Sequence, residues 1–156
     1  MAGLFYEDIH VGQELISGTH TVSSSDITAF ADLTRDRHAL HVDEEHARRM
    51  GFPGVIAHGL FGLSLMEGLK SELLVYEHTS IASLGWDKVR FRTSVSVGDT
   101  LQLRIKFQSK RISRKPDRGI VIEMLELVNQ RGEIVTVAEH TSLVRCRAPE
   151  NESAVP

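Results

Sequence analysis

Four segments in the second half of the chain alternate apolar and polar residues, a pattern typical of strands that bury one face of a sheet. They cover residues 89–97, 101–107, 120–128 and 134–144, and the turn or loop sequences between them each contain a glycine. Because short turns join neighbouring antiparallel strands, the pattern predicts a four-stranded antiparallel meander. The apolar face of such a sheet needs another element to cover it.

The longest helical pattern in the chain covers residues 58–74 and precedes these strands. Its apolar residues form one stripe and also fill most of the first half of the helix: Gly62, Met66, Leu69 and Leu73 on the stripe, with Leu60, Phe61, Leu63 and Leu65 beside it. A helix that is apolar nearly all round must be buried. Together with the strands, it predicts an α+β protein whose long antiparallel sheet curls around one central helix.

The residues before the central helix predict one further strand and two short helices. Residues 13–22 have the pattern of a first strand, and Ser23 and Asp26 then have the spacing of a helix-opening capping box. This first helix should end near Leu33. A second short helix should cover residues 43–50, where a glycine and a proline follow.

Composition limits the classes of protein to consider. The 156 residues fit one folded domain, which we expect over residues 1–147, followed by a disordered polar tail at 148–156. A net charge of -3 without a long single-sign block does not indicate nucleic-acid binding. The sequence has neither a signal-peptide pattern nor an apolar run of membrane-spanning length. Its one cysteine, Cys146, permits no intramolecular disulfide. We therefore expect a cytoplasmic protein.

A carboxylate and an imidazole lie five residues apart in the polar stretch TRDRHALH, residues 34–41. The stretch is too polar and irregular for the core, and on one loop Asp36 and His41 can both reach a single water. Taken one at a time, Asp36 has the simpler interpretation of closing a turn, and His41 that of a structural histidine. Their spacing makes them the candidate catalytic pair.

The same stretch carries a resemblance to a known family. The sequence DRHALH, residues 36–41, followed by VDEEHARRMGFPG, resembles the signature of the MaoC-like (R)-specific enoyl-CoA hydratases, in which Asp and His flank an Asn-Pro-aliphatic run. VIAHGL (55–60) and FRTSVSVGDTL (91–101) are similar to later family segments in the same order, so the resemblance covers most of residues 13–145. The departures from the pattern are Arg35 for Gly, His38 for Asn, Ala39 for Pro and Ser94 for a strand Pro.

The resemblance implies a hot dog fold, in which an antiparallel sheet wraps a long central helix, and a hydro-lyase activity. The reaction is the reversible addition of water to a trans-2-enoyl thioester of CoA or acyl carrier protein, giving an (R)-3-hydroxyacyl thioester. It uses no cofactor beyond the CoA that the substrate carries. Asp36 and His41 match the family's catalytic pair, and Gly59 matches the residue whose N–H binds the thioester carbonyl. His58 flanks that pocket, and Glu67 falls where the family has a small residue shaping the acyl pocket.

Other interpretations remain open at this stage. A thioesterase of the hot dog fold would place its acid near the central helix, where Glu67 is the only carboxylate in the core half. The departures at Arg35, His38 and Ala39 favour a non-catalytic acyl-CoA-binding protein. A metal site is not expected, because the resembled family needs none and no His-x-x-x-His helix is present; the side chains that suggest one are His38, His41, Glu45 and His46.

The predicted sheet also has consequences for assembly. A single domain of this kind leaves a strand edge open, and open edges are usually paired or covered. Members of the resembled family pair two sheets side by side, so we expect a homodimer or a higher homo-oligomer.

Overall fold

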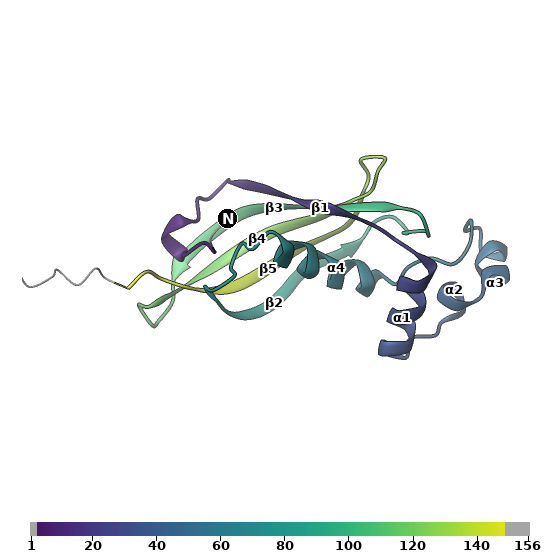
Figure 1. Ribbon diagram of the computed structural model, residues 1–156, viewed down its shortest axis with the longest axis horizontal. Coiled ribbons are helices and arrows are strands. Elements are labelled where there is room, and N and C mark those ends of the chain that lie inside the picture. Colours follow the sequence, from purple (N-terminus) through teal and green to yellow (C-terminus); the bar gives the residue numbers. More distant parts are fainter. Residues whose placement is uncertain (1–2, 149–156) are drawn as a thin grey trace, which may run out of the picture.

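The computed structural model describes residues 3–148, so most of the predicted tail lies outside the described residues. In chain order the elements are η1 (Tyr6–Asp8), β1 (Glu14–Thr21), α1 (Ser24–Thr34), α2 (Ala39–Val42), α3 (Glu44–Arg49), α4 (Gly59–Glu72), β2 (Ser80–Phe91), β3 (Thr100–Ile112), β4 (Arg118–Val128) and β5 (Ile134–Arg145). The strands form one antiparallel sheet in the order β1-β3-β4-β5-β2. The sheet curves around α4, and α1, α2 and α3 lie together beyond one end of it (Figure 1). The predicted α+β class is confirmed.

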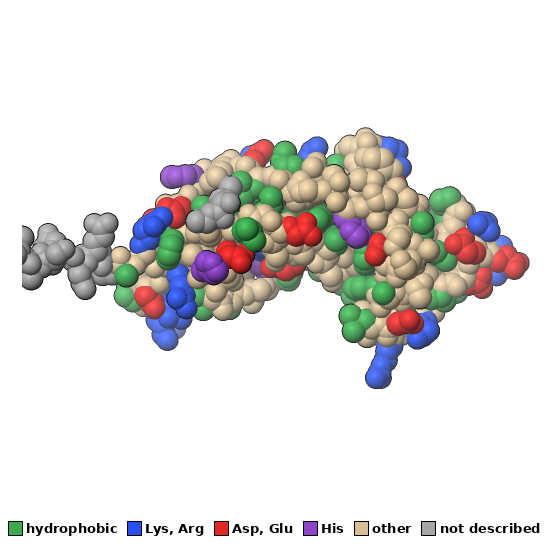
Figure 2. Space-filling model, viewed as in Figure 1, with side chains coloured by type: hydrophobic (Ala, Val, Ile, Leu, Met, Phe, Trp, Pro, Cys, Tyr) green, Lys and Arg blue, Asp and Glu red, His purple; other side chains and the backbone are tan. Residues whose placement is uncertain are grey.

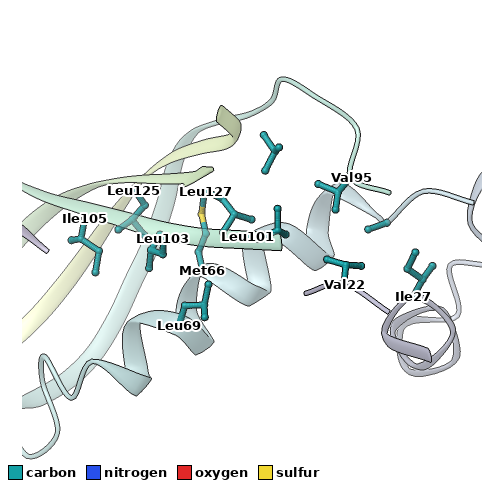
Figure 3. Packing of buried hydrophobic residues seen from close by; sticks show 12 residues of the cluster. Val22, Ile27, Met66, Leu69, Val95, Leu101, Leu103, Ile105, Leu125 and Leu127 are labelled. Atoms are coloured by element: carbon teal, nitrogen blue, oxygen red, sulfur yellow. The ribbon is translucent and has the colours of Figure 1, made fainter. Parts of the chain in front are cut away.

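The core lies between α4 and the concave face of the sheet. Met66 and Leu69 of α4 are fully buried and point toward leucines and isoleucines of β3 and β4, as Figure 3 shows. Each fully buried side chain of this size contributes roughly 1.5–3 kcal/mol through the hydrophobic effect. This contact fixes both the position of α4 and its rotation about its own axis.

The elements of the first half follow the sequence prediction closely. The predicted first strand is β1, and the capping box opens α1: Asp26 N–H donates to Ser23 Oγ at 3.1 Å, and Ser23 N–H donates to Asp26 Oδ2 at 2.9 Å. The central helix is present as α4, but its predicted burial on all sides is wrong, because Leu60 is 58% exposed. The sheet covers only one face of the helix.

The order of the predicted meander is wrong at its first strand. Only residues 89–91 of the predicted strand 89–97 are in a strand: β2 begins at Ser80 and ends at Phe91, and residues 92–99 form a loop that crosses to β3. β2 pairs with β5 at the opposite edge of the sheet, so only β3, β4 and β5 form a meander. Three register shifts and positive φ angles at Gly85 and Lys88 disrupt the alternation within β2, which is why its pattern does not mark the strand.

The surface has no dominant sign of charge on the face shown in Figure 2, where acidic and basic side chains intermingle, for example over α3. Among the described residues, no helix has the length and apolarity needed to cross a membrane.

A cluster of buried polar side chains lies at the end of the core farthest from α1. Lys70 of α4 is 4% exposed, and its Nζ lies 3.1 Å from Glu123 Oε2 and 2.9 Å from His140 Nδ1. Glu123 also accepts a hydrogen bond from the Tyr76 hydroxyl. Charges are rarely buried unless they are paired and hydrogen-bonded, and here each one is. The sequence patterns do not predict this cluster.

Replacing Lys70 by methionine should destabilise the fold strongly, because the buried Glu123 carboxylate loses its compensating charge. We expect Lys70→Met to lower the free energy of unfolding by about 3–5 kcal/mol. The matched control is Lys106→Met, which breaks an exposed ion pair with Glu14 and should cost less than about 1 kcal/mol. Urea unfolding followed by circular dichroism measures both. Equal losses in the two variants would contradict this account of the cluster.

Candidate active site

The candidate loop begins where α1 ends in a left-handed residue. Arg35 has φ 66° and ψ 10° and caps the C-terminus of α1. Glycine usually occupies this position, because other residues pay roughly 1–2 kcal/mol to adopt the left-handed conformation. Arg35 nevertheless takes it, so the chain turns as a glycine would allow. Asp36 N–H then donates to Thr34 Oγ1 at 3.3 Å.

A short helix that the sequence analysis missed, α2, carries the histidine of the pair. His38 caps its N-terminus: Nδ1 accepts a hydrogen bond from Leu40 N–H at 3.3 Å, the task that an asparagine oxygen often performs. Ala39 is the first helical residue, where proline is common. The departures from the family pattern at these two positions therefore preserve the helix start that Asn-Pro favours.

His41 lies at the far end of this turn with one ring nitrogen already engaged. Its Nδ1 donates to the Ile56 carbonyl at 2.6 Å, because a carbonyl can only accept. In the neutral ring, this bond leaves Nε2 with a free lone pair. Burial lowers the pKa of His41, and the nearby His58 and His38 lower it further, against opposing effects of the Ile56 bond and of Asp36. At any given pH, a larger fraction of His41 is therefore neutral than of a histidine with the ordinary pKa.

His58 holds the loop and His41 together. It caps the N-terminus of α4 and is 4% exposed. Its Nε2 donates to the Asp36 carbonyl at 2.9 Å, and its ring stacks on His41 with 3.7 Å between centroids. One buried side chain thus contacts both members of the pair, so His58 positions Asp36 and His41 relative to α4.

The three side chains converge on one point at the edge of the core. One ligand-type atom from each of Asp36, His41 and His58 lies within 4.8 Å of the other two, with Asp36 exposed and His58 buried. This spacing lets one water contact both the Asp36 carboxylate and the His41 ring. The structure therefore brings together the pair that the sequence singled out.

The ring geometry is poorly suited to a metal centre. The planes of His41 and His58 are 24° apart, so their in-plane lone pairs run side by side instead of meeting at one ion. The other side chains considered for a metal do not belong to this group; they are His38, Glu45 and His46.

Gly59 opens α4 beside the pair, as predicted. A cavity of about 220 Å³ is lined by His41, His58 and Gly59, together with Phe91 of β2. A side chain at Gly59 would place Cβ 2.6 Å from the Phe91 ring, so the close approach requires glycine.

Among the described residues, no acceptor binds the Gly59 N–H. A helix N-terminus with a free N–H suits a developing negative charge. Phe91 was not singled out from the sequence, because β2 was misplaced.

Glu67 does not join this group. It lies two turns further along α4, in a second cavity with Lys70 and His140. The sequence placed Glu67 in the acyl pocket but gave no sign of its buried neighbours.

Comparison with known proteins gives the same family as the sequence resemblance. The model of the MaoC like domain matches residues 9–126. The 3-hydroxybutyryl-CoA dehydratase of Methylorubrum extorquens is 32% identical over 103 residues, which are 66% of this chain and 63% of that protein. This chain therefore spans less than two thirds of that relative.

Solved structures support the same fold. The MaoC-like dehydratase from Rhodospirillum rubrum has a TM-score of 0.84 and 30% identity, covering 94% of this chain and 100% of that one. A Mycobacterium tuberculosis protein described as having a double hotdogfold has a TM-score of 0.80 and 22% identity, covering 99% of this chain and 46% of that one. The hot dog fold predicted from the sequence is confirmed.

Removing the imidazole of His58 should change the titration of His41. His58→Phe keeps an aromatic ring against His41 but removes a nearby group that can carry positive charge. We expect the pKa of His41 to rise but to stay below its ordinary value, since burial is the larger cause of its depression. NMR titration of the His41 ring measures the shift. His10→Phe, an exposed histidine near β1, is the matched control and should leave the titration of His41 unchanged; a fall in the His58→Phe variant would contradict the prediction.

Proposed function

The chain belongs to the MaoC-like domain family, and from that membership we propose that it is an (R)-specific enoyl-CoA hydratase, which is also a 3-hydroxyacyl-CoA dehydratase. The reaction is the reversible addition of water to a trans-2-enoyl thioester. The observation that carries the proposal is the convergence of the Asp36 and His41 side chains, with His41 in the same cavity as Gly59, whose N–H has no acceptor among the described residues. We also place the protein in the cytosol, because Cys146 as the sole cysteine permits no intramolecular disulfide.

In the proposed mechanism, the pair holds one water between them. The Asp36 carboxylate accepts a hydrogen bond from the water, and His41 Nε2 accepts the other proton as the oxygen attacks Cβ of the enoyl group. The imidazolium then returns its proton to Cα, which leaves His41 neutral again and completes the addition of one water. No metal or redox cofactor takes part.

Stabilisation of the thioester oxygen is assigned to α4. As water adds, negative charge develops on the thioester oxygen, and the Gly59 N–H at the helix N-terminus donates to it. Loss of one such donor typically lowers a rate on the order of a hundredfold or more. Phe91 lies over Gly59 and limits the room on that side of the cavity.

The proposal is tested by the fate of crotonyl-CoA. We expect loss of the enoyl absorbance without release of free thiol, and a fall in rate of about 10²–10⁴-fold in both Asp36→Asn and His41→Ala. Thermal unfolding of each variant shows whether the fold persists. Glu72→Gln, which alters an exposed carboxylate at the end of α4, is the matched control and should retain the rate. Thiol release would identify a thioesterase, and binding without turnover of any enoyl thioester would identify a non-catalytic acyl-CoA-binding protein.

We further propose that the active form is a homodimer joined along β2. The outer edge of β2 has no partner strand in the described part of the chain, and it carries exposed apolar side chains at Leu84 and Phe91. Exposed edges of this kind favour pairing with a second copy.

Light scattering after size-exclusion chromatography should therefore give the mass of a dimer or a multiple of it. Leu84→Asp should shift the population toward monomer, because a carboxylate would be buried at the proposed contact. Val11→Asp alters an equally exposed apolar residue near the start of β1 and should not. A monomeric wild type at micromolar concentration would overturn the proposal.

A further inference from the structure

A second cavity lies along α4, beyond the proposed catalytic pair. Its volume is about 200 Å³, and Glu67, Lys70, Ser83 and His140 are among the side chains that line it. We propose that this cavity binds a hydroxyl group carried near the far end of the substrate's acyl chain. The inference rests on the proposed function, because the other end of the same chain must reach Asp36 and His41.

The two cavities share the same two walls. In the first, Gly62 of α4 faces Thr136 of β5, since a Cβ at Gly62 would lie 3.2 Å from Thr136 Oγ1. In the second, Lys70 of α4 meets His140 of β5 at 2.9 Å. The eight residues of helix between these points span about 12 Å, and the four residues of strand span about 13 Å. α4 and β5 therefore run in the same direction, and the acyl groove of this proposal joins the two cavities between them.

The middle of this groove is apolar. Gly59, Leu63 and Glu67 recur at four-residue spacing on one face of α4, so Leu63 lies between the two cavities. On β5, Ala138 occupies the inward position between Thr136 and His140. An acyl chain laid along the groove from Gly59 would pass apolar side chains first and then reach a polar end.

The polar end offers acceptors to a ligand. His140 Nδ1 lies 2.9 Å from Lys70 Nζ and 3.0 Å from Glu123 Oε2, so the imidazole is part of the buried charge cluster. Ser83 Oγ lies 2.6 Å from His140 Nε2, and whichever of the two atoms donates, the hydroxyl oxygen keeps a lone pair for a ligand. Glu67 Oε2 forms an ion pair with Lys70 at 3.2 Å, yet it is buried and makes no hydrogen bond among the described residues.

Both acceptors lie near one ring nitrogen. Glu67 Oε2 is 3.9 Å and Ser83 Oγ is 2.6 Å from His140 Nε2. A ligand hydroxyl can donate to the Glu67 carboxylate or to Ser83 Oγ, which a methyl group cannot do. A ligand carboxylate is disfavoured as well, because the single Lys70 ammonium faces the carboxylates of both Glu123 and Glu67.

The test compares three thioesters of equal length: trans-2-octenoyl-CoA, 8-hydroxy-trans-2-octenoyl-CoA and trans-2-octenedioyl-CoA. The value of kcat/KM should be highest for the hydroxylated substrate, by about 5-fold to 100-fold over octenoyl-CoA, because an alkyl end cannot donate a hydrogen bond to Glu67 or Ser83. A preference for the alkyl or the dicarboxylate substrate would overturn the inference. The hexenoyl and decenoyl series should be run in parallel to fix the length.

Substitutions in the second cavity identify the cause of the preference. Ser83→Ala and Glu67→Gln should each reduce the ratio of kcat/KM for hydroxylated over alkyl substrate toward one. Ser80→Ala is the matched control, because Ser80 lines the same cavity but lies outside the hydrogen-bonded group, and it should retain the ratio. An unchanged ratio in Ser83→Ala and Glu67→Gln alike would contradict the assignment.

Binding can be followed without turnover, which separates this inference from the proposed function. Trp86 is the only tryptophan of the chain, and its ring lies 4.4 Å from that of His140. Titration with saturated 8-hydroxyoctanoyl-CoA should change Trp86 fluorescence at a lower concentration than octanoyl-CoA. If no enoyl thioester is hydrated but this preference persists, the proposed reaction fails and the hydroxyl site stands. If crotonyl-CoA is hydrated but the preference is absent, the hydroxyl site fails and the reaction stands.

Discussion

The packing of α4 into the concave face of the sheet is the constraint on which both cavities depend. Met66 and Leu69 are fully buried against β3 and β4, and this contact fixes the rotation of the helix. The N-terminus of α4 is thereby held beside the loop that carries Asp36, and its last turns beside β5. A rotation by one residue would remove Lys70 from Glu123 and Gly59 from Phe91 together.

The loop that carries Asp36 shows how residues that depart from a family pattern can take the conformations that the usual residues favour. Arg35 takes the left-handed conformation that glycine favours, and His38 caps α2 through Nδ1 as asparagine would through its oxygen. The loop depends less on these residues than on His58, which binds the Asp36 carbonyl from a buried position. The strain at Arg35 is tolerated because surrounding contacts determine the path of the chain.

Elements whose signal is local were predictable, and those that depend on distant partners were not. The capping box of α1 and the apolar stripe of α4 are periodic or short-range patterns, and both appear where the sequence places them. The spacing of Asp36 and His41 likewise sufficed to bring them together on one loop. The edge pairing of β2 with β5 joins residues far apart in sequence, and bulges at Gly85 and Lys88 hide its alternation. The stacking of His58 on His41 has no sequence signal of its own.

The buried charges at the far end of α4 are not explained by the stability of the sheet. A buried ion pair such as Lys70 with Glu123 can often be replaced by well-packed apolar residues without loss of stability. The neighbouring stretch of the same groove, at Leu63 and Ala138, is in fact apolar. Polar side chains are therefore concentrated at the cavities and are absent at Leu63 and Ala138 between them. A wall that must hydrogen-bond to a ligand accounts for this distribution, whereas a requirement for packing alone does not.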